Sequence, residues 1–125
     1  MSTAYWELPG LEQVYLEDSW VLGIEVDQQR AAFQLELVLT EDHPRYQPPR
    51  PGEQYCYAPA RLVFECAELV ELQLSGAPPA TDASGEHDLG NIDTLCQVEG
   101  GYVATGDWGA LRVRGGRVRI DYDYQ

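Results

Sequence analysis

The chain has 125 residues, 44% of them hydrophobic, which is enough for one domain with a core of its own. It carries 21 acidic residues against 8 basic ones, all of them arginines, so its formal net charge is -13. This charge argues against nucleic acid and anionic membranes as partners, because both are bound through cations, and it favours a basic partner.

The cysteines and the first residues of the chain indicate the cellular compartment in which the protein is expected. Cys56, Cys66 and Cys96 show no metal-ligand or redox spacing, and their odd number argues against a disulfide framework. Residues 1–7 have neither a basic segment nor an apolar run, and nothing approaches the roughly 20 apolar residues of a membrane span. We therefore expect a cytoplasmic protein with reduced thiols and no cofactor.

Alternation of apolar and polar residues is the main structural signal, and it predicts β-strands. The first such segment covers 20–26 and places four apolar residues on one face: Trp20, Leu22, Ile24 and Val26. After a polar turn at 27–30, the segment 31–39 has apolar residues at its odd positions. We expect a hairpin in which these odd residues face the core.

Residues 40–59 interrupt the alternation with five prolines, which lack the backbone donor that a central strand needs. We expect a long loop whose tyrosines fold back onto the body. Alternation resumes over 61–74, although Glu68 falls on the apolar parity. A bulge or bend near Ala67 would resolve this conflict, and a short helix over 65–74 is the alternative.

The C-terminal third alternates again after a polar loop over 75–90. Glycine pairs at 100–101 and 115–116 predict two tight turns, with a further turn at 107–109. These turns predict a four-stranded meander with two apolar cross-strand pairs: Val98 with Val103, and Val113 with Val118.

About eight such segments predict a single domain over residues 1–125. Its fold class is all-β or mainly β, an antiparallel sandwich or a partly open barrel with a C-terminal meander. The sequence has no motif of a known catalytic centre, so we assign no catalytic residue and do not expect an enzyme. Cys56 with His43 or His87, or paired carboxylates such as Asp82 and Glu86, is the catalytic alternative.

Four arginines fall on one face of the predicted last hairpin, opposite Val113: Arg112, Arg114, Arg117 and Arg119. In that register they face one another in pairs, and like charges across strands repel. We therefore expect Asp or Glu side chains beside them. An anionic ligand is the alternative.

Two loops supply the candidate binding residues. The loop over 40–59 combines tyrosines with arginines, as interface hot spots do, and its tyrosines could also stack on sugars. The loop over 75–91 is rich in oxygen ligands that suit hard cations, but its spacing fits no EF-hand or zinc motif, and we assign no metal ligands. The candidate residues for a ligand or partner are His43, Tyr46, Tyr55, Tyr57, Asp82, Glu86, Asp88 and Trp108. Each loop also has a purely structural interpretation, as a cover for the fold or as a stiffened connection.

Several stretches stand out together, and they cover nearly the whole chain: 15–19, 39–44, 51–57, 81–86, 90–93 and 106–109. The set resembles a family of small, uncharacterised bacterial proteins. The resemblance implies a bacterial cytoplasmic protein and brings no activity or catalytic residue with it.

The leading functional hypothesis is a non-catalytic, acidic protein-binding module. Such a protein could neutralise a basic partner, as an immunity protein neutralises a cationic toxin. The alternative is a small-ligand binder, for a saccharide or a metal ion, that uses the aromatic loop and the acidic loop. A pocket that brings aromatic rings and carboxylates together would favour this alternative.

Overall fold

This computed structural model describes residues 3–74, 80–81 and 87–122. These residues form nine β-strands, one short 3₁₀ helix and the loops that connect them. The helix, η1, spans Tyr5–Glu7. The strands are β1 Thr3–Ala4, β2 Val14–Val26, β3 Ala31–Leu39, β4 Cys56–Leu74, β5 Ala80–Thr81, β6 His87–Asp88, β7 Ile92–Val98, β8 Gly101–Gly106 and β9 Gly109–Asp121.

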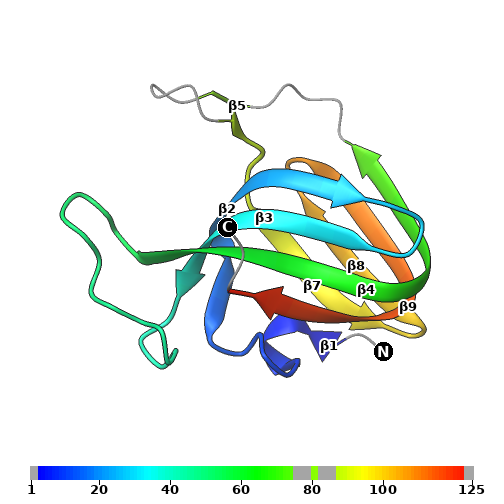
Figure 1. Ribbon diagram of the computed structural model, residues 1–125, viewed down its shortest axis with the longest axis horizontal. Helices are drawn as coiled ribbons and strands as arrows, with labels where there is room; N and C mark the ends of the chain where they lie inside the picture. The colour runs from blue at the N-terminus through cyan, green and yellow to red at the C-terminus, as the bar shows by residue number, and fades with distance from the viewer. Residues whose placement is uncertain (1–2, 75–79, 82–86, 123–125) are drawn as a thin grey trace.

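Seven of these strands form one antiparallel sheet in the order β1–β7–β8–β9–β4–β3–β2 (Figure 1). The sheet curves around a single interior without closing into a barrel, and β5 and β6 pair separately. The all-β prediction, with about eight strands and a C-terminal meander, is confirmed. No helix in the described residues is long and apolar enough to cross a membrane.

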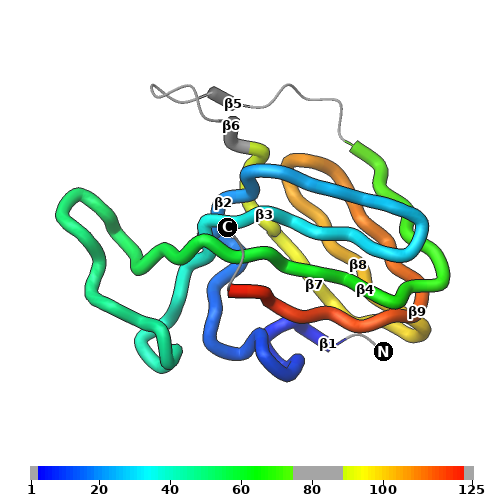
Figure 2. The backbone as a smooth tube through the Cα atoms, in the orientation of Figure 1, coloured from blue at the N-terminus to red at the C-terminus, as the bar shows by residue number. Residues whose placement is uncertain are grey.

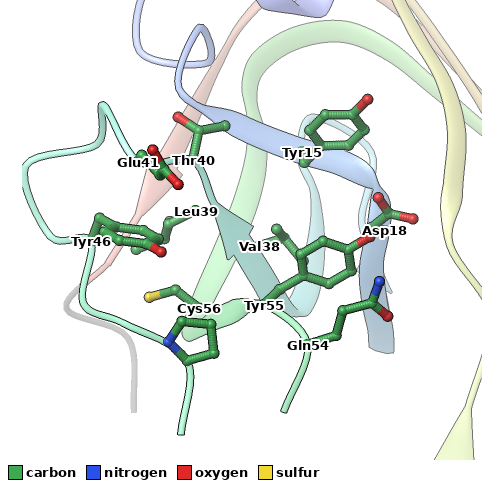
Figure 3. Close-up of a pocket in the computed structure, with 11 residues that line it drawn as sticks. Tyr15, Asp18, Val38, Leu39, Thr40, Glu41, Tyr46, Gln54, Tyr55 and Cys56 are labelled. Atoms are coloured by element: carbon green, nitrogen blue, oxygen red, sulfur yellow. The ribbon is translucent and has the colours of Figure 1, made fainter.

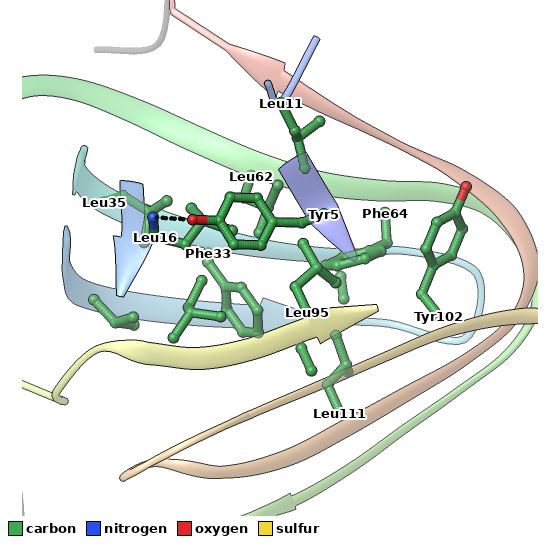
Figure 4. Packing of buried hydrophobic residues seen from close by; sticks show 14 of the residues in the cluster. Tyr5, Leu11, Leu16, Phe33, Leu35, Leu62, Phe64, Leu95, Tyr102 and Leu111 are labelled. Atoms are coloured by element: carbon green, nitrogen blue, oxygen red, sulfur yellow. Dashed lines mark hydrogen bonds between the residues drawn. The ribbon is translucent and has the colours of Figure 1, made fainter. Parts of the chain in front are cut away.

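The core lies on the concave side of the sheet (Figure 4). The five odd-numbered residues of β3 are buried as predicted: Ala31, Phe33, Leu35, Leu37 and Leu39. The ring of Phe33 packs against two other rings, with centroid distances of 4.9 Å to Trp108 and 6.2 Å to Phe64. Regular alternation along β3 thus supplies the centre of the core.

The predicted apolar face of β2 is not the face that packs on the core. Three of its four residues are exposed: Trp20, Leu22 and Val26. Val21, assigned to the other face, is fully buried. The pairing with β3 shifts between Tyr15 and Trp20 and again between Val21 and Gly23. Each such shift moves the following side chains to the opposite face, so simple alternation fails here.

β4 bends at the predicted place. Cys66 has a φ of +59°, and the pairing with β9 shifts between Ala67 and Leu69. The helix alternative over 65–74 is wrong, because β4 continues as a strand to Leu74.

The glycine pair at 115–116 does not form the predicted turn, because β9 continues through it without reversing direction. Both glycines have positive φ, +69° and +77°, which lets β9 follow the bend of β4. A Cβ on Gly116 would lie 2.7 Å from the carbonyl oxygen of Glu65. Val113 and Val118 consequently pair with β4 and not with each other.

The hairpin of β7 and β8 is present, but its turn lies one residue earlier than predicted. Glu99 and Gly100 form the turn, so Val98 pairs with Gly101 and not with Val103. The turn after β8 is confirmed, since Gly106 pairs with Gly109. The meander therefore contains three strands, β7, β8 and β9, and not four.

The arginines of β9 do not pair with one another, because β9 is a single strand that pairs with β4 and β8. The Nη2 atom of Arg117 lies 3.1 Å from Glu65 Oε2, and Arg119 forms an ion pair with the same carboxylate. The expected acidic neighbours are thus confirmed for Arg117 and Arg119. The hydrogen bond from Arg119, followed by that from Arg117, lowers the pKa of Glu65 below its ordinary value.

The two ends of the curved sheet approach each other along a line between β2 and β7, which we call the seam. Val21 N–H donates to the carbonyl of Gly90 over 2.8 Å, and Leu89 N–H donates to the carbonyl of Val21 over 2.9 Å. Nearer to β1, the side chain of Tyr5 reaches Leu16 of β2 instead (Figure 4). The seam is therefore joined by backbone at one end and by a side chain at the other.

Candidate functional site

The loop between β3 and β4, residues 40–55, projects from one end of the sheet and is fastened where it begins (Figure 2). Both the N–H and the hydroxyl of Thr40 donate to the carbonyl of Gln13 over 3.1 Å. His43 Nε2 lies 2.8 Å from the hydroxyl of Tyr122, just beyond β9. The guanidinium of Arg45 lies over the same ring, 5.1 Å from its centroid.

The hydrogen bonds of His43 indicate which ring nitrogen carries the proton of the neutral side chain. Its Nδ1 accepts the N–H of Arg45 over 3.0 Å, so the proton of the neutral ring is on Nε2, which donates it to Tyr122. Burial and the positive charge of Arg45 lower the pKa of His43. The neutral ring thus connects the loop to the end of β9.

Between this loop and strands β2 and β3 lies a cavity of about 360 Å³, which we call the loop cavity (Figure 3). Its lining combines three tyrosines with two carboxylates: Tyr15, Tyr46, Tyr55, Asp18 and Glu41. The side chains of Tyr55 and Asp18 lie close together in this lining (Figure 3), and the negative charge of Asp18 raises the pKa of Tyr55. Tyr55 therefore stays protonated.

A second cavity of about 580 Å³ lies over the seam, between η1, β2 and β7, and we call it the seam cavity. It is lined by three aromatic rings and three carboxylates: Tyr5, Trp6, Tyr15, Glu17, Asp18 and Asp93. Tyr15 and Asp18 line both cavities. The two cavities therefore adjoin at these two side chains, and we call them together the aromatic–acidic groove. No arginine is among the described residues that line it.

An irregularity in β2 brings Glu17 and Asp18 to the same cavity. Neighbouring residues of a regular strand point to opposite faces, but the register of β2 shifts in this segment. The buried hydroxyl of Ser19 supports the shifted backbone. It donates to the carbonyl of Tyr15 over 2.7 Å and accepts the N–H of Val38 over 2.9 Å.

Tyr5 fixes the position of Glu17. Its hydroxyl accepts the N–H of Leu16 over 3.2 Å and donates to Glu17 Oε2 over 2.9 Å. Burial of the Tyr5 ring raises the pKa of its hydroxyl, which therefore stays protonated. A carboxylate has about four lone-pair positions, so Glu17 keeps acceptor capacity for a ligand.

The structure brings some of the predicted site residues together. Tyr46 and Tyr55 line the loop cavity. Tyr57 packs edge-on against Tyr55, with ring centroids 6.1 Å apart. His43 lies outside the cavity lining, where it fastens the loop to Tyr122.

Other predicted site residues lie elsewhere. Trp108 is buried in the core, where its Nε1 donates to the carbonyl of Asn91 over 3.1 Å. Asp82 and Glu86 are outside the described residues, as is the side chain of Asp88. The acidic loop thus contributes no described residue to either cavity.

The prediction from sequence missed several residues that line the groove: Trp6, Tyr15, Glu17, Asp18 and Asp93. The signal for three of them was a run that mixes an aromatic residue with two acids, over 15–18, inside a segment otherwise typical of a strand. No local pattern indicates that residue 93 lies beside that run, because their contact depends on how the two ends of the sheet meet.

The described part of the groove shows neither a metal-binding group nor a cysteine paired with a histidine. The described residues contain no group of three or more His, Cys, Asp or Glu side chains placed to hold a metal ion. Cys56 lines the loop cavity, and its sulfur accepts the N–H of Gln47 over 3.4 Å. His43 directs both ring nitrogens to other partners, so it is not placed to act as a base for Cys56.

Comparisons with known proteins gave no match to any family model, to the curated proteins or to solved structures.

Proposed function

We propose that the protein is a non-catalytic binding module for a basic protein partner, and that the aromatic–acidic groove is its contact surface. One observation carries this proposal. Two adjoining cavities together present four carboxylates and five aromatic rings without an arginine, on a chain with a net charge of -13.

The charge of the groove favours cationic groups. Carboxylates in a lining without arginine attract a cation without first breaking an ion pair within that lining. The strong overall negative charge also accelerates the approach of a basic protein. The partner's Arg or Lys side chains would therefore be both steered to the groove and held there.

The aromatic rings favour a protein partner. Trp6 and Tyr15 are 57% and 49% exposed, although large aromatic side chains gain by burial. Tryptophan, tyrosine and arginine dominate the energetics of protein interfaces, and arginine stacks well on aromatic faces. Exposed rings surrounded by carboxylates are thus the complement of an arginine-bearing surface.

The proposal is tested with a blocked dodecapeptide of alternating arginine and glycine, whose binding is measured by calorimetry at low ionic strength. We expect Asp18→Asn to weaken binding by about tenfold, since it removes the carboxylate shared by both cavities. Glu99→Gln is the matched control, because it removes the same charge at the exposed turn between β7 and β8. Equal losses in the two variants would show that only net charge matters and would refute the groove as the site.

A kinetic measurement complements this test. We expect the association rate of the peptide to fall by about tenfold or more from low to high salt, with a smaller change in the dissociation rate. Tyr15→Ala should instead raise the dissociation rate, because it removes a contact and no charge. A salt-independent association rate would contradict electrostatic steering.

A small-ligand binder is the second candidate, and the loop cavity favours it. Its volume of about 360 Å³ falls in the range of small-molecule sites, and its tyrosines could stack on a sugar ring. A titration with a panel of neutral mono- and disaccharides, followed by tyrosine and tryptophan fluorescence, distinguishes the two candidates. Saturable binding that Tyr46→Ala abolishes and salt does not affect would favour the saccharide.

A further inference from the structure

We infer that the groove takes two neighbouring arginine side chains of one extended partner segment, one in each cavity. This inference rests on the proposed function and specifies the chemistry of the partner.

The division of the groove is the first argument. Tyr15 and Asp18 form a wall shared by the loop cavity and the seam cavity. Beyond this wall each cavity has carboxylates of its own, Glu41 on one side and Glu17 with Asp93 on the other. A ligand with a single cationic group would leave one of these acidic compartments unused.

One carboxylate near the wall is already oriented. Tyr5 donates to Glu17 Oε2 over 2.9 Å. This bond holds the Glu17 side chain in place before a ligand arrives and leaves lone pairs for it. Pre-orientation reduces the entropy lost on binding, which favours charged donors with a fixed geometry.

The combination of rings and acids favours arginine over lysine. A guanidinium is planar and forked, so it can stack on a ring and donate to a carboxylate at the same time. The seam cavity offers the exposed ring of Trp6 beside Glu17 and Asp93, and the loop cavity offers Tyr46 beside Glu41. Lysine, a strongly hydrated point charge, uses only the carboxylates.

The spacing of the two cavities suits an extended segment. Alternate residues of an extended chain point to the same side and lie about 7 Å apart. The two cavities lie side by side, because Tyr15 and Asp18 belong to both linings, so such a pair can enter one cavity each. We therefore expect arginines at positions i and i+2 of the partner.

The experiment uses a blocked pentapeptide with arginine at its second and fourth positions, threonine between them and glycine at both ends. It is compared with two peptides in which either arginine is replaced by glutamine, and with one that carries two lysines. Binding is followed by ¹⁵N chemical-shift titration. We expect the two-arginine peptide to bind at least about tenfold more tightly than either single-arginine peptide, and more tightly than the lysine peptide.

Variants of the protein locate the two arginines. Glu41→Gln affects only the loop cavity and Asp93→Asn only the seam cavity. Each variant should remove most of the affinity that the second arginine adds, whereas Glu99→Gln should leave that added affinity unchanged.

Two patterns would overturn the inference while the proposed function stands: no gain from the second arginine, or equal binding of lysine. If neither cavity variant differs from Glu99→Gln for any peptide, the proposed function fails as well.

Discussion

Two regions of the sheet depart from regular strand geometry, and they differ in whether their carboxylates are paired with arginines. Where β4 and β9 bend together, both strands are irregular at the same place, and Glu65 pairs with Arg117 and Arg119 across them. Where β2 departs from the register of β3, Glu17 and Asp18 are turned towards a groove whose described lining contains no arginine. A matched irregularity thus gives curvature with internal ion pairs, while an unmatched one places carboxylates in a groove whose described lining has no arginine.

The largest effect is expected from breaking the bend of β9. Gly116→Ala forces a side chain onto a φ of +77° and places its Cβ 2.7 Å from the carbonyl oxygen of Glu65. We expect a loss of about 2–4 kcal/mol in the free energy of unfolding, measured by chemical denaturation.

Gly52→Ala is the control for this change, because its φ is +86° but no atom lies within 4 Å of the added Cβ. It should cost about 1–2 kcal/mol through backbone conformation alone. Equal costs at the two positions would show that the close contact at the bend does not constrain the fold.

The second effect concerns β2. Ser19→Ala removes the hydroxyl that bonds the carbonyl of Tyr15 and leaves the buried N–H of Val38 without that acceptor. We expect a loss of about 1–3 kcal/mol in unfolding free energy. Because Ser19 supports the segment that carries Glu17 and Asp18, binding of the arginine–glycine peptide should weaken as well.

The control here is Thr94→Ala, which removes an exposed hydroxyl pair with Thr105. It should change stability by less than about 0.5 kcal/mol. If Ser19→Ala destabilises the fold but leaves peptide binding unchanged, the irregularity of β2 does not position the groove.

The sequence predicts the regular part of this fold well, because alternation holds wherever strands pair without shifts. All five odd-numbered residues of β3 are buried as expected. Alternation fails for β2, since two register shifts exchange its faces and sequence alone does not show where they fall. The pair at 115–116 was misinterpreted for a related reason: positive φ suits both a tight turn and a bent strand.

The candidate site was predictable only for the aromatic residues that the proline-rich loop contributes. Tyr46 and Tyr55 stand out in a proline-rich loop and do line a cavity. Glu17 and Asp18 reach the same surface only because the register of β2 shifts, and Asp93 joins them from the far end of the sheet. The mixed run over 15–18 is visible in the sequence, but its placement beside Asp93 depends on long-range pairing and leaves no local trace.

The third prediction concerns the pH dependence of stability, and it tests whether His43 fastens the loop over 40–55 to the end of β9. The pKa of His43 lies below its ordinary value of 6.5, because of burial and then of Arg45. The unfolded chain therefore binds a proton more readily than the folded chain, and stability falls as the pH drops below about 6.5 until the folded-state pKa is passed. Protonation of His43 at Nδ1 also removes the hydrogen bond that this atom accepts from the N–H of Arg45.

We expect wild-type protein to lose more stability between pH 7 and pH 5 than His43→Gln, as judged by unfolding midpoints at each pH. Tyr122 resonances should shift over the same range, because His43 Nε2 contacts its hydroxyl. Parallel pH profiles for the two proteins would contradict a role of His43 in this dependence.

The smallest effect is expected from the ion pairs at the bend. Arg117 and Arg119 have side chains 70% and 48% exposed, so solvent screens their attraction to Glu65. Glu65→Gln should therefore cost only about 0.5–1 kcal/mol near neutral pH. Since its pKa is lowered, this contribution is present above the ordinary value of 4.5 and is lost as the pH falls through the folded-state value.

Asp93→Asn provides the opposite case, because it removes an exposed carboxylate from a groove without a lining arginine, on a chain of net charge -13. It should leave the unfolding free energy unchanged or raise it slightly, as self-repulsion decreases. The two variants remove the same charge, so opposite signs in their effects on stability would separate a carboxylate that stabilises the fold from one that does not. If Asp93→Asn destabilises the protein as much as Glu65→Gln does, the groove carboxylates are structural and the contrast between the two regions does not hold.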